Sequence, residues 1–272
     1  LPWYAPQKYF DLYPLEEILL PDVLENDLDD IPREGKELAA FRRGDFLNIK
    51  KSGKWKEAVQ AYLACISFAD AQLGRVLDAL EKNSRDKNTI IIFWSDHGWH
   101  LGEKQHWHKS TLWEEATRIP FTVVAPGITA AGSKCKRPID TLCIFPTLLE
   151  LCKLKPINGL DGVSIVPLLK DPNMDWKIPA VSEFRRGQCA VRSERYRYIR
   201  YSDGTSELYD HSKDPNEWKN ISSKEYQGVI DDLSEFIPKT FAANAPSKGS
   251  YEFDPYTYSW THKKTLKMTK GK

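Results

Sequence analysis

The stretch TIIIFWSDHGWHLGE, residues 89–103, determines how the rest of the chain is organised. After Thr89 its first part is a continuous apolar run, which is typical of a parallel strand covered by helices on both faces. Asp96 and His97 follow where the run ends. Open α/β sheets place their chemistry just outside the carboxyl ends of such strands. We therefore predict a functional site in the loop that begins at Ser95.

The segments on either side of this stretch alternate between helical and strand-like patterns. An apolar run at 121–125, closed by Pro126 and Gly127, predicts a second strand, and a helix is expected near 146–152 with Pro146 in its first turn. This alternation predicts an α/β fold. The strongest helical pattern spans residues 54–82, where apolar residues recur at helical spacing: Val59, Leu63, Ile66, Leu73, Val76, Leu77 and Leu80.

The sequence changes character after about residue 180. Short aromatic runs with alternating polarity predict a small antiparallel meander, and residues 202–205 are expected to form a hairpin turn. A short helix near 223–237 and a Tyr- and Lys-rich tail from about 245 complete the chain. At the other end, residues 1–34 are expected to form an extended surface segment with one short helix near 14–19.

Composition excludes several classes of function. The chain has 272 residues and a net charge of +1, so it has no strong attraction for nucleic acid or anionic membranes. No apolar run is long enough to span a bilayer. Its five cysteines contain no C-x-x-C pair, which argues against a zinc ribbon or redox motif and leaves the redox compartment open. The opening residues 1–6 resemble neither a signal peptide nor an initiator context and indicate a fragment or processed chain.

Asp96 and His97 are candidate metal ligands. The alternative is that Asp96 caps a turn while His97 donates to the backbone. Gly98 favours the functional interpretation because it permits a close backbone approach. Calcium takes six to eight oxygen ligands and zinc takes four ligands, so one carboxylate with one imidazole satisfies neither. This count predicts further carboxylates from another segment.

The continuation of the loop supplies a cation and several aromatic residues. Lys109 follows two histidines and is suited to bind an oxyanion as a compact point charge, although a solvated surface lysine is the alternative. Trp99, Trp107 and Trp113 are candidates for apolar walls. Glu114 and Glu115 are interpreted as residues that open a helix.

In order along the chain, these motifs resemble the second half of type I sulfatases. Three segments carry the resemblance: residues 95–103, residues 107–109 and residues 115–121. Within that family the chain most resembles the iduronate 2-sulfatase branch, and the match covers roughly residues 1–240. Supporting similarity lies at residues 1–6 and 13–16, at Asp140 with 145–150, at 162–164 with 167–169, and at 207–210 with 214–217.

The resemblance implies a partial alkaline-phosphatase-like sulfatase α/β domain over residues 1–180. It implies a small antiparallel β-sheet subdomain with a C-terminal helix and tail over residues 181–272. The implied activity is hydrolysis of a sulfate ester, on a sulfated small molecule or glycan, with a formylglycine nucleophile and bound calcium.

The resemblance also implies roles for individual residues. Asp96 and His97 are expected to bind the metal, and Lys109 is expected to contact the sulfate and stabilise its developing charge. His108 and His100 are candidate substrate contacts. For His100 and His106, packing within the loop is the favoured alternative.

The nucleophile that the family requires is not found in this chain. No cysteine or serine begins a C/S-x-P-x-R motif, and the segment Cys143-Ile144-Phe145-Pro146 has its proline one place late and lacks the arginine. The paired aspartates that complete the family's calcium site are also missing. We therefore expect the N-terminal half of a sulfatase as a partner and expect this chain alone to be inactive.

Two other functions remain as alternatives. One is a phosphomonoesterase or phosphodiesterase of the same superfamily, although such enzymes usually need more metal-binding His and Asp residues. The other is a non-catalytic fragment that binds sulfated glycans. The family suggests an exported location, periplasmic or extracellular, or a lysosomal one.

Overall fold

The computed structural model describes residues 3–41, 43–242, 251–254, 256–257, 259–265 and 268–270. The chain divides into two compact units, Leu1–Ile237 and Pro238–Lys272. Residues 1–2 of the opening motif and residues 243–250 of the predicted tail lie outside the described residues. The division predicted at residue 180, between a catalytic portion and a subdomain, stays a prediction.

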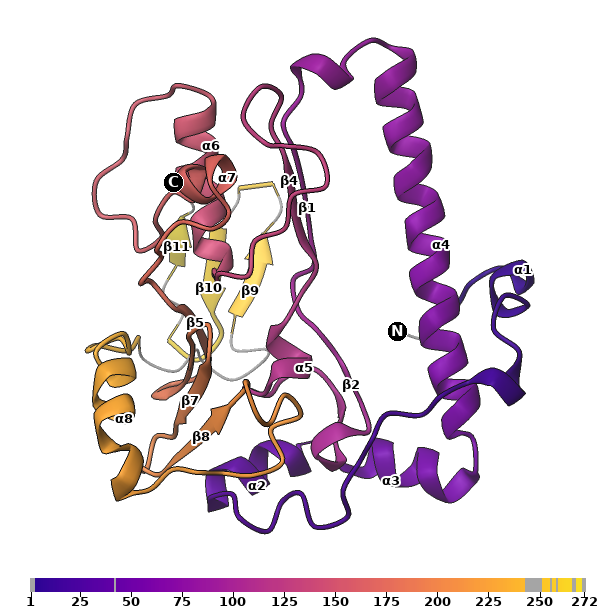
Figure 1. Cartoon of the computed structure of the whole chain (residues 1–272), viewed down its shortest axis with the longest axis vertical. Coiled ribbons are helices and arrows are strands. Elements are labelled where there is room, and N and C mark those ends of the chain that lie inside the picture. Colours follow the sequence, from indigo (N-terminus) through magenta and orange to yellow (C-terminus); the bar gives the residue numbers. More distant parts are fainter. Residues whose placement is uncertain are drawn as a thin grey trace. The chain divides into compact units, whose positions relative to one another are not determined.

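Helix α4, Trp55–Lys82, is the longest element of the first unit and confirms the helix predicted at 54–82 (Figure 1). It ends at Asn83, whose side-chain amide donates to the carbonyl of Ala79 at 2.7 Å. One part of its apolar stripe packs inward, where Val59 joins a buried cluster with Phe46. Another part is exposed, and Val76 keeps 66% of its surface.

Strand β1, Ile91–Trp94, pairs with β4, Phe121–Val124, in an antiparallel ladder from Ile91–Val124 to Trp94–Phe121. The prediction of a parallel strand covered on both faces is therefore wrong for this pairing. A parallel neighbour requires a crossover connection, whereas the segment between β1 and β4 folds back as a loop. The side chains of Phe93 and Trp94 are 40% and 44% exposed, and in the described ranges β1 pairs with β4 alone.

The returning loop carries its own small elements. Strands β2, His100–Leu101, and β3, Trp107–His108, form a short antiparallel hairpin. The 3-10 turn η3, Glu103–Gln105, joins them, and helix α5, Glu114–Thr117, follows. This hairpin rests on the cluster that contains Phe46 and Trp107, so the predicted site loop is anchored on the helical part of the unit.

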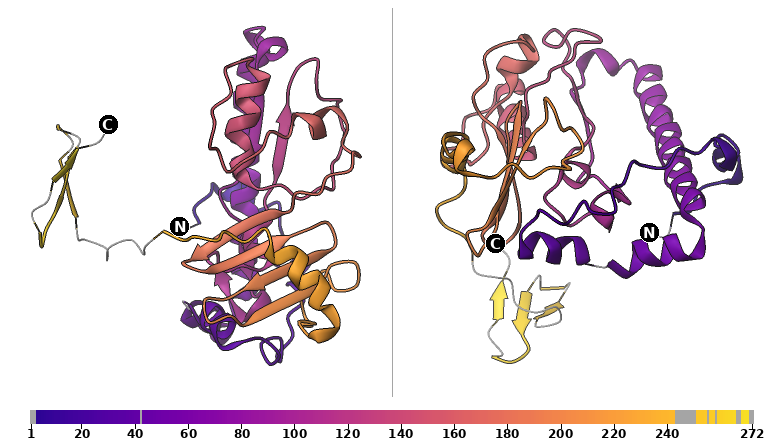
Figure 2. Two further views of the ribbon diagram at one scale, coloured as in Figure 1. Left: turned by 90° about the vertical axis from the view of Figure 1, so that its left-hand side faces the viewer. Right: turned by 60° about the horizontal axis from the view of Figure 1, so that its bottom comes forward.

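A four-stranded antiparallel sheet confirms the meander predicted after residue 180. Its strands lie in chain order, and helix α8, Gln227–Ser234, follows them (Figure 2). The main buried cluster lies where helix α2, Arg33–Ala40, and Trp113 pack on this sheet. The strands are β5, Ala180–Arg185; β6, Gln188–Arg192; β7, Tyr196–Arg200; and β8, Ser206–Asp210.

Shorter helices complete the first unit. Helix α6, Ile144–Leu151, confirms the helix expected near 146–152, with Pro146 in its first turn. The helix expected near 14–19 is reduced to a single 3-10 turn, η1, Leu15–Glu17. The remaining elements are α1, Gln7–Phe10; α3, Arg43–Ser52; η2, Asp86–Asn88; η4, Thr141–Cys143; α7, Val166–Lys170; and η5, Lys224–Tyr226.

The second unit contains an antiparallel three-stranded sheet with β10 in the centre. Its strands are β9, Tyr251–Asp254; β10, Ser259–His262; and β11, Met268–Lys270. Within the described ranges, no helix is both long enough and apolar enough to cross a membrane.

Candidate functional site

Asp96 and His97 lie directly after β1 and point their donor atoms toward each other. His97 Nε2 is 3.5 Å from Asp96 Oδ1, and the side chains are 28% and 74% exposed. The other ring nitrogen, His97 Nδ1, is 2.7 Å from the carbonyl oxygen of Gly98. Because a carbonyl only accepts, Nδ1 is the donor in this contact, and Nε2 is the ring nitrogen that lies beside the carboxylate.

Backbone contacts fix the turn that carries this pair. The N–H of Gly98 donates to the carbonyl of Ala116 in α5 at 2.8 Å. A Cβ atom at position 98 would lie only 2.0 Å from the carbonyl oxygen of Glu115 and 2.7 Å from that of Arg118. Glycine is therefore required here for the turn to lie against α5.

The donor set at Asp96 and His97 fits part of the coordination shell of a divalent cation. A carboxylate oxygen and an imidazole nitrogen converge, and the backbone contact of Nδ1 is the outer contact that metal-binding histidines usually have. Two ligands leave either a calcium or a zinc shell incomplete. The geometry therefore agrees with the expectation that further ligands come from another segment.

Lys109 lies in a conformationally strained part of the loop. His108 and Ser110, its neighbours on both sides, have φ angles of 103° and 74°. Such left-handed conformations cost about 1–3 kcal/mol each for residues other than glycine and persist where surrounding contacts enforce them. Here His108 Nε2 is 2.6 Å from Asp45 Oδ2 of α3. The Lys109 side chain itself is exposed.

Trp99 connects the two parts of the loop. Its ring centroid lies 6.1 Å from that of His97 and 4.8 Å from that of His108. Through this ring, the structure brings the Asp96–His97 pair to the segment that carries Lys109.

His100 is fully buried and has partners at both ring nitrogens. Nδ1 lies 3.1 Å from the carbonyl of Glu103, and Nε2 lies 2.7 Å from the hydroxyl of Thr111. Burial, together with neighbouring His106, lowers the pKa of His100 to about 3, so the ring is neutral. These contacts give His100 the packing role that was the alternative to substrate contact.

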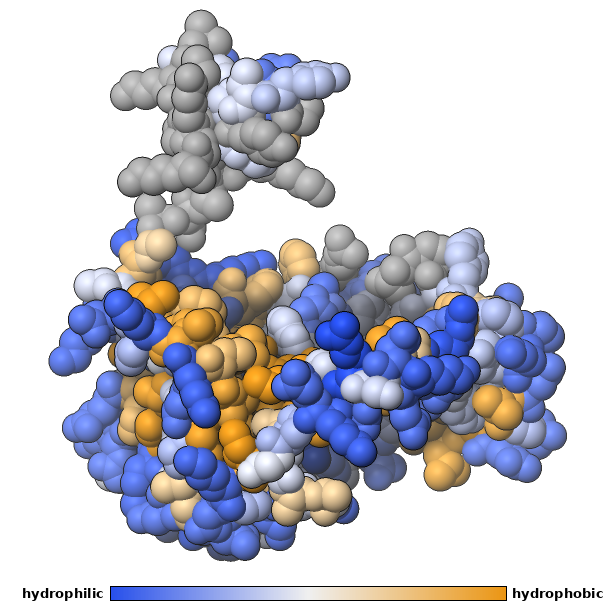
Figure 3. Space-filling view, turned by 90° about the horizontal axis from the view of Figure 1, so that it is seen from above, coloured by the Kyte–Doolittle hydropathy of each residue, from blue (hydrophilic) through white to orange (hydrophobic). Residues whose placement is uncertain are grey.

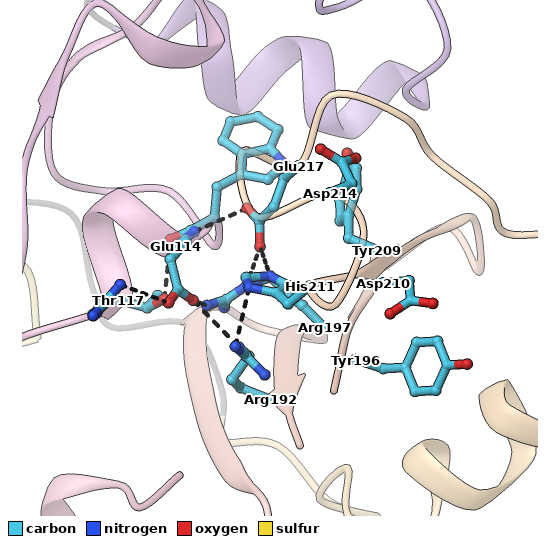
Figure 4. Close-up of polar contacts among 12 residues, drawn as sticks. Glu114, Thr117, Arg192, Tyr196, Arg197, Tyr209, Asp210, His211, Asp214 and Glu217 are labelled. Carbon is cyan, nitrogen blue, oxygen red and sulfur yellow. Dashed lines mark hydrogen bonds and ion pairs between the residues drawn. The ribbon is translucent and has the colours of Figure 1, made fainter. Parts of the chain in front are cut away.

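A second polar cluster, which we call the carboxylate–guanidinium network, consists of Glu114, Arg192, Arg197, His211 and Glu217 (Figure 4). Arg197 Nε is 2.5 Å from Glu217 Oε1, and the same oxygen is 2.8 Å from His211 Nε2. Glu114 pairs with both arginines and, through its backbone N–H, donates to Glu217 at 3.0 Å. The network thus joins α5 to strands β6 and β7 and to the segment after β8.

The charges in this network largely balance each other. Burial alone would raise the pKa of Glu217, but Arg197 and His211 lower it to about 2. Ligand atoms of Glu114, His211 and Glu217 all lie within 4.8 Å of one another, a spacing that suits a metal. However, guanidinium groups already neutralise both carboxylates. The network therefore needs no cation to be stable.

Sequence reasoning did not identify this network. Glu114 does open a helix, as expected, but its side chain also pairs with Arg197, which lies 83 positions away. The available signal was a charged residue between aromatic neighbours in a predicted strand, as at Arg197. Glu207 is buried, and its carboxylate accepts hydrogen bonds from Trp113, Tyr201 and Tyr209.

Comparison with known families identifies the class of protein. The sulfatase family profile matches residues 5–154, and the profile for the C-terminal region of N-sulphoglucosamine sulphohydrolase matches residues 102–242. The chain belongs to the sulfatase family.

Individual relatives agree with this assignment. A sulfatase from Formosa agariphila is 42% identical over 258 residues, which cover 94% of this chain and 50% of the relative. An arylsulfatase from Clostridium perfringens is 30% identical over 249 residues, which cover 88% of this chain and 50% of the relative. The chain thus spans about half the length of these relatives.

A solved structure supports the fold. It is a complex with the substrate D-glucosamine-2-N,6-O-disulfate, is 28% identical, and has a TM-score of 0.62 over 76% of this chain and 47% of that one. The α/β, alkaline-phosphatase-like fold class predicted from the sequence is confirmed.

Proposed function

We propose that this chain is the C-terminal part of a sulfatase that hydrolyses a sulfate ester. The observation that carries the proposal is the loop after β1, where Asp96 and His97 converge and Lys109 is exposed on a strained segment. A carboxylate–imidazole pair suits a metal, and an exposed ammonium suits the sulfate bound to it.

In this proposal Asp96 and His97 hold a calcium ion, as the family resemblance implies. The bound cation supplies Lewis acidity toward a sulfate oxygen. The other oxygen ligands come from the N-terminal half of the sulfatase, as does the formylglycine nucleophile. His97 Nδ1 donates to the carbonyl of Gly98, and this contact would leave Nε2 available to hold the cation.

Lys109 stabilises the negative charge that develops on the sulfate oxygens. His108, fixed by Asp45, is the proposed second contact to the substrate. His100 stays neutral inside the loop and acts by packing, because both of its ring nitrogens are already bonded.

Exposed apolar side chains on β1, β4 and α4 support the N-terminal half as a partner. Phe93 and Trp94 of β1, Val124 of β4, and Ile66 and Val76 of α4 are all exposed. The space-filling view shows hydrophobic residues gathered on one face (Figure 3). Apolar patches of this kind commonly mark interaction surfaces. We call the chain together with this N-terminal half the assembled protein.

The proposed substrate is a sulfated sugar. The order of motifs along the chain favours an iduronate-type glycan sulfate. The likeness to a solved structure in complex with its substrate D-glucosamine-2-N,6-O-disulfate supports the wider class of sulfated glycans. The domain division proposed with this function is a catalytic portion over residues 1–180 and an antiparallel subdomain over residues 181–272. An exported or lysosomal location goes with such a substrate.

The test is sulfate release by the assembled protein from sulfated disaccharides, with matched phosphate monoesters for comparison. Lys109→Ala should lower kcat/KM about 10²–10³-fold, the usual loss when a transition-state contact is removed. Lys136→Ala is the matched control because Lys136 is also an exposed lysine but lies outside the loop. Faster turnover of the phosphate esters, or an unchanged kcat/KM in Lys109→Ala, would contradict the proposal.

A further inference from the structure

His106 occupies an unusual position between two backbone carbonyl groups. The ring is fully buried. Nδ1 lies 3.0 Å from the carbonyl oxygen of Ala39, the last residue but one of α2, and Nε2 lies 3.0 Å from the carbonyl oxygen of Lys109. The imidazole therefore links the loop that carries Lys109 to the end of α2.

The protons on the ring decide whether this link is complete. Both partners are carbonyl oxygens, which only accept hydrogen bonds, whereas a neutral imidazole carries a single N–H. Both hydrogen bonds are therefore formed only when His106 is an imidazolium. In the neutral ring, one nitrogen directs a lone pair at a carbonyl oxygen and that contact is lost.

His100, whose ring centroid lies 5.2 Å from that of His106, provides the contrast. One of its nitrogens donates to the carbonyl of Glu103, and the other accepts from the hydroxyl of Thr111. A neutral His100 thus satisfies both of its partners. Of these two neighbouring buried rings, His106 has partners that require a second proton.

The groups that face His106 set the pH range of this second protonation. They are His100 in β2, His108 in β3 and Asp45 in α3. Burial lowers the pKa of His106, and the two carbonyls and Asp45 oppose this without reversing it. The pKa of His106 lies below the ordinary value of 6.5, so the doubly bonded form develops as the pH falls below that value.

We propose that His106 is a positioning residue, whose imidazolium form ties the carbonyl of Lys109 to α2 and thereby holds the Lys109 ammonium in place for the sulfate. The neutral form releases one of the two contacts and loosens residues 107–110. The left-handed conformations of His108 and Ser110 need such a restraint to persist. The inference rests on the sulfate-binding role of Lys109 proposed above, and it predicts that the loop tightens as the pH falls.

Two substitutions separate the two contacts. His106→Gln places an amide nitrogen near the position of Nε2 and keeps a donor for Lys109 at every pH. His106→Asn places its amide near Nδ1 and keeps the Ala39 contact but not the Lys109 contact. Neither side chain titrates in this range, so each variant keeps its one contact at every pH.

The test measures amide hydrogen exchange of residues 107–110 in the assembled protein, corrected for intrinsic rates, at about pH 5 and about pH 7.5, on either side of the ordinary histidine pKa. In the unmodified protein we expect about fivefold weaker protection at the higher pH, the factor that corresponds to one lost hydrogen bond. His106→Gln and His106→Asn each keep only one of the two contacts, so both should show weak protection that does not change between the two pH values.

Activity and spectroscopy complete the design. The ratio of kcat/KM between the unmodified protein and His106→Gln should change about fivefold over the same pH interval. Nitrogen chemical shifts of the unmodified protein report the ring protons directly, so the test stands even when a variant fails to fold. A His106 ring that stays neutral at about pH 5, or pH-independent protection of residues 107–110 across the range of the histidine pKa, would overturn the inference.

The outcomes also distinguish this inference from the proposed function. If the assembled protein releases no sulfate while the exchange of residues 107–110 follows His106, the sulfatase proposal fails and the link itself stands. If sulfate is released but exchange does not follow His106, only the positioning role fails.

Discussion

Two charged regions meet at helix α5, and their charged side chains differ in exposure and in pairing. On one side, the carbonyl of Ala116 holds the turn that carries Asp96 and His97, whose polar atoms face outward. On the other side, Glu114 enters the carboxylate–guanidinium network, where Arg197 and Glu217 are almost fully buried. The first region is open to a ligand, and the second is closed on itself.

This difference separates charges that are satisfied inside the protein from charges that remain accessible to a ligand. Buried carboxylates that pair with guanidinium groups are satisfied inside the protein and are costly to disturb. An exposed carboxylate beside a correctly oriented imidazole has no such internal role and is available for a ligand. Because α5 contacts both regions, the network also helps to hold the turn that carries Asp96 and His97 in place.

The largest expected effect comes from breaking the network. Arg197→Met leaves Glu114 and Glu217 buried without their main partner, so we expect the free energy of unfolding to fall by about 3–5 kcal/mol. Urea denaturation of the assembled protein measures this loss. Arg33→Met is the matched control, because Arg33 pairs with Glu37 while both side chains are more than half exposed, and it should cost less than about 1 kcal/mol. Equal losses of the free energy of unfolding in the two variants would show that the buried network contributes no more to stability than an exposed ion pair.

The next effect concerns the contact between α5 and the turn that carries Asp96 and His97. A methyl group at Gly98 would overlap the carbonyl of Glu115. We expect Gly98→Ala to lower the free energy of unfolding by about 1–3 kcal/mol, the usual cost of overpacking, and to weaken metal binding at the same time. Gly74→Ala is the control because no atom lies near the added methyl group in α4. Metal affinity that survives in Gly98→Ala would show that the turn is not held by α5.

A smaller effect should appear in the pH dependence of stability. Burial, and then the charge of Glu217, raises the pKa of Glu115 from 4.5 to about 8. The folded state therefore holds this proton more tightly than the unfolded state, and the free energy of unfolding falls as pH rises from 4.5 toward 8. Thermal melts of Glu115→Gln should lack this part of the fall, whereas the exposed control Glu225→Gln should retain it. Identical pH profiles for all three proteins would refute this assignment.

The smallest effect on stability is expected at the open region. Asp96 and Lys109 are exposed, so Asp96→Asn and Lys109→Ala should change the free energy of unfolding by no more than about 0.5 kcal/mol, although both should impair sulfate release. Urea denaturation beside activity assays separates the two quantities. A large loss of stability in either variant would place that residue among the structural charges instead.

Local patterns predicted much of the fold. The spacing of apolar residues in α4, the proline in the first turn of α6 and the alternation in strands β6 to β8 each depend on neighbouring positions, which the sequence displays directly. The apolar run of β1 indicated a strand but contained no information about the direction of its neighbour. Its antiparallel pairing with β4 had to come from the structure.

The site was only partly predictable for the same reason. Asp96, His97 and Lys109 lie in one short segment, so their chemistry was visible together. The contacts of Glu114 with Glu217 and of His106 with Ala39 join residues 103 and 67 positions apart. The sequence does not show which residues form such pairs, because the two members are far apart along the chain.

Calcium binding tests the central claim most directly, because it compares the two regions in one experiment. Isothermal titration of the assembled protein should show one calcium site, whose affinity falls at least about tenfold in Asp96→Asn and stays unchanged in Glu114→Gln provided that variant remains folded. Calcium binding that survives in Asp96→Asn but is lost in folded Glu114→Gln would place the metal in the carboxylate–guanidinium network and contradict the account.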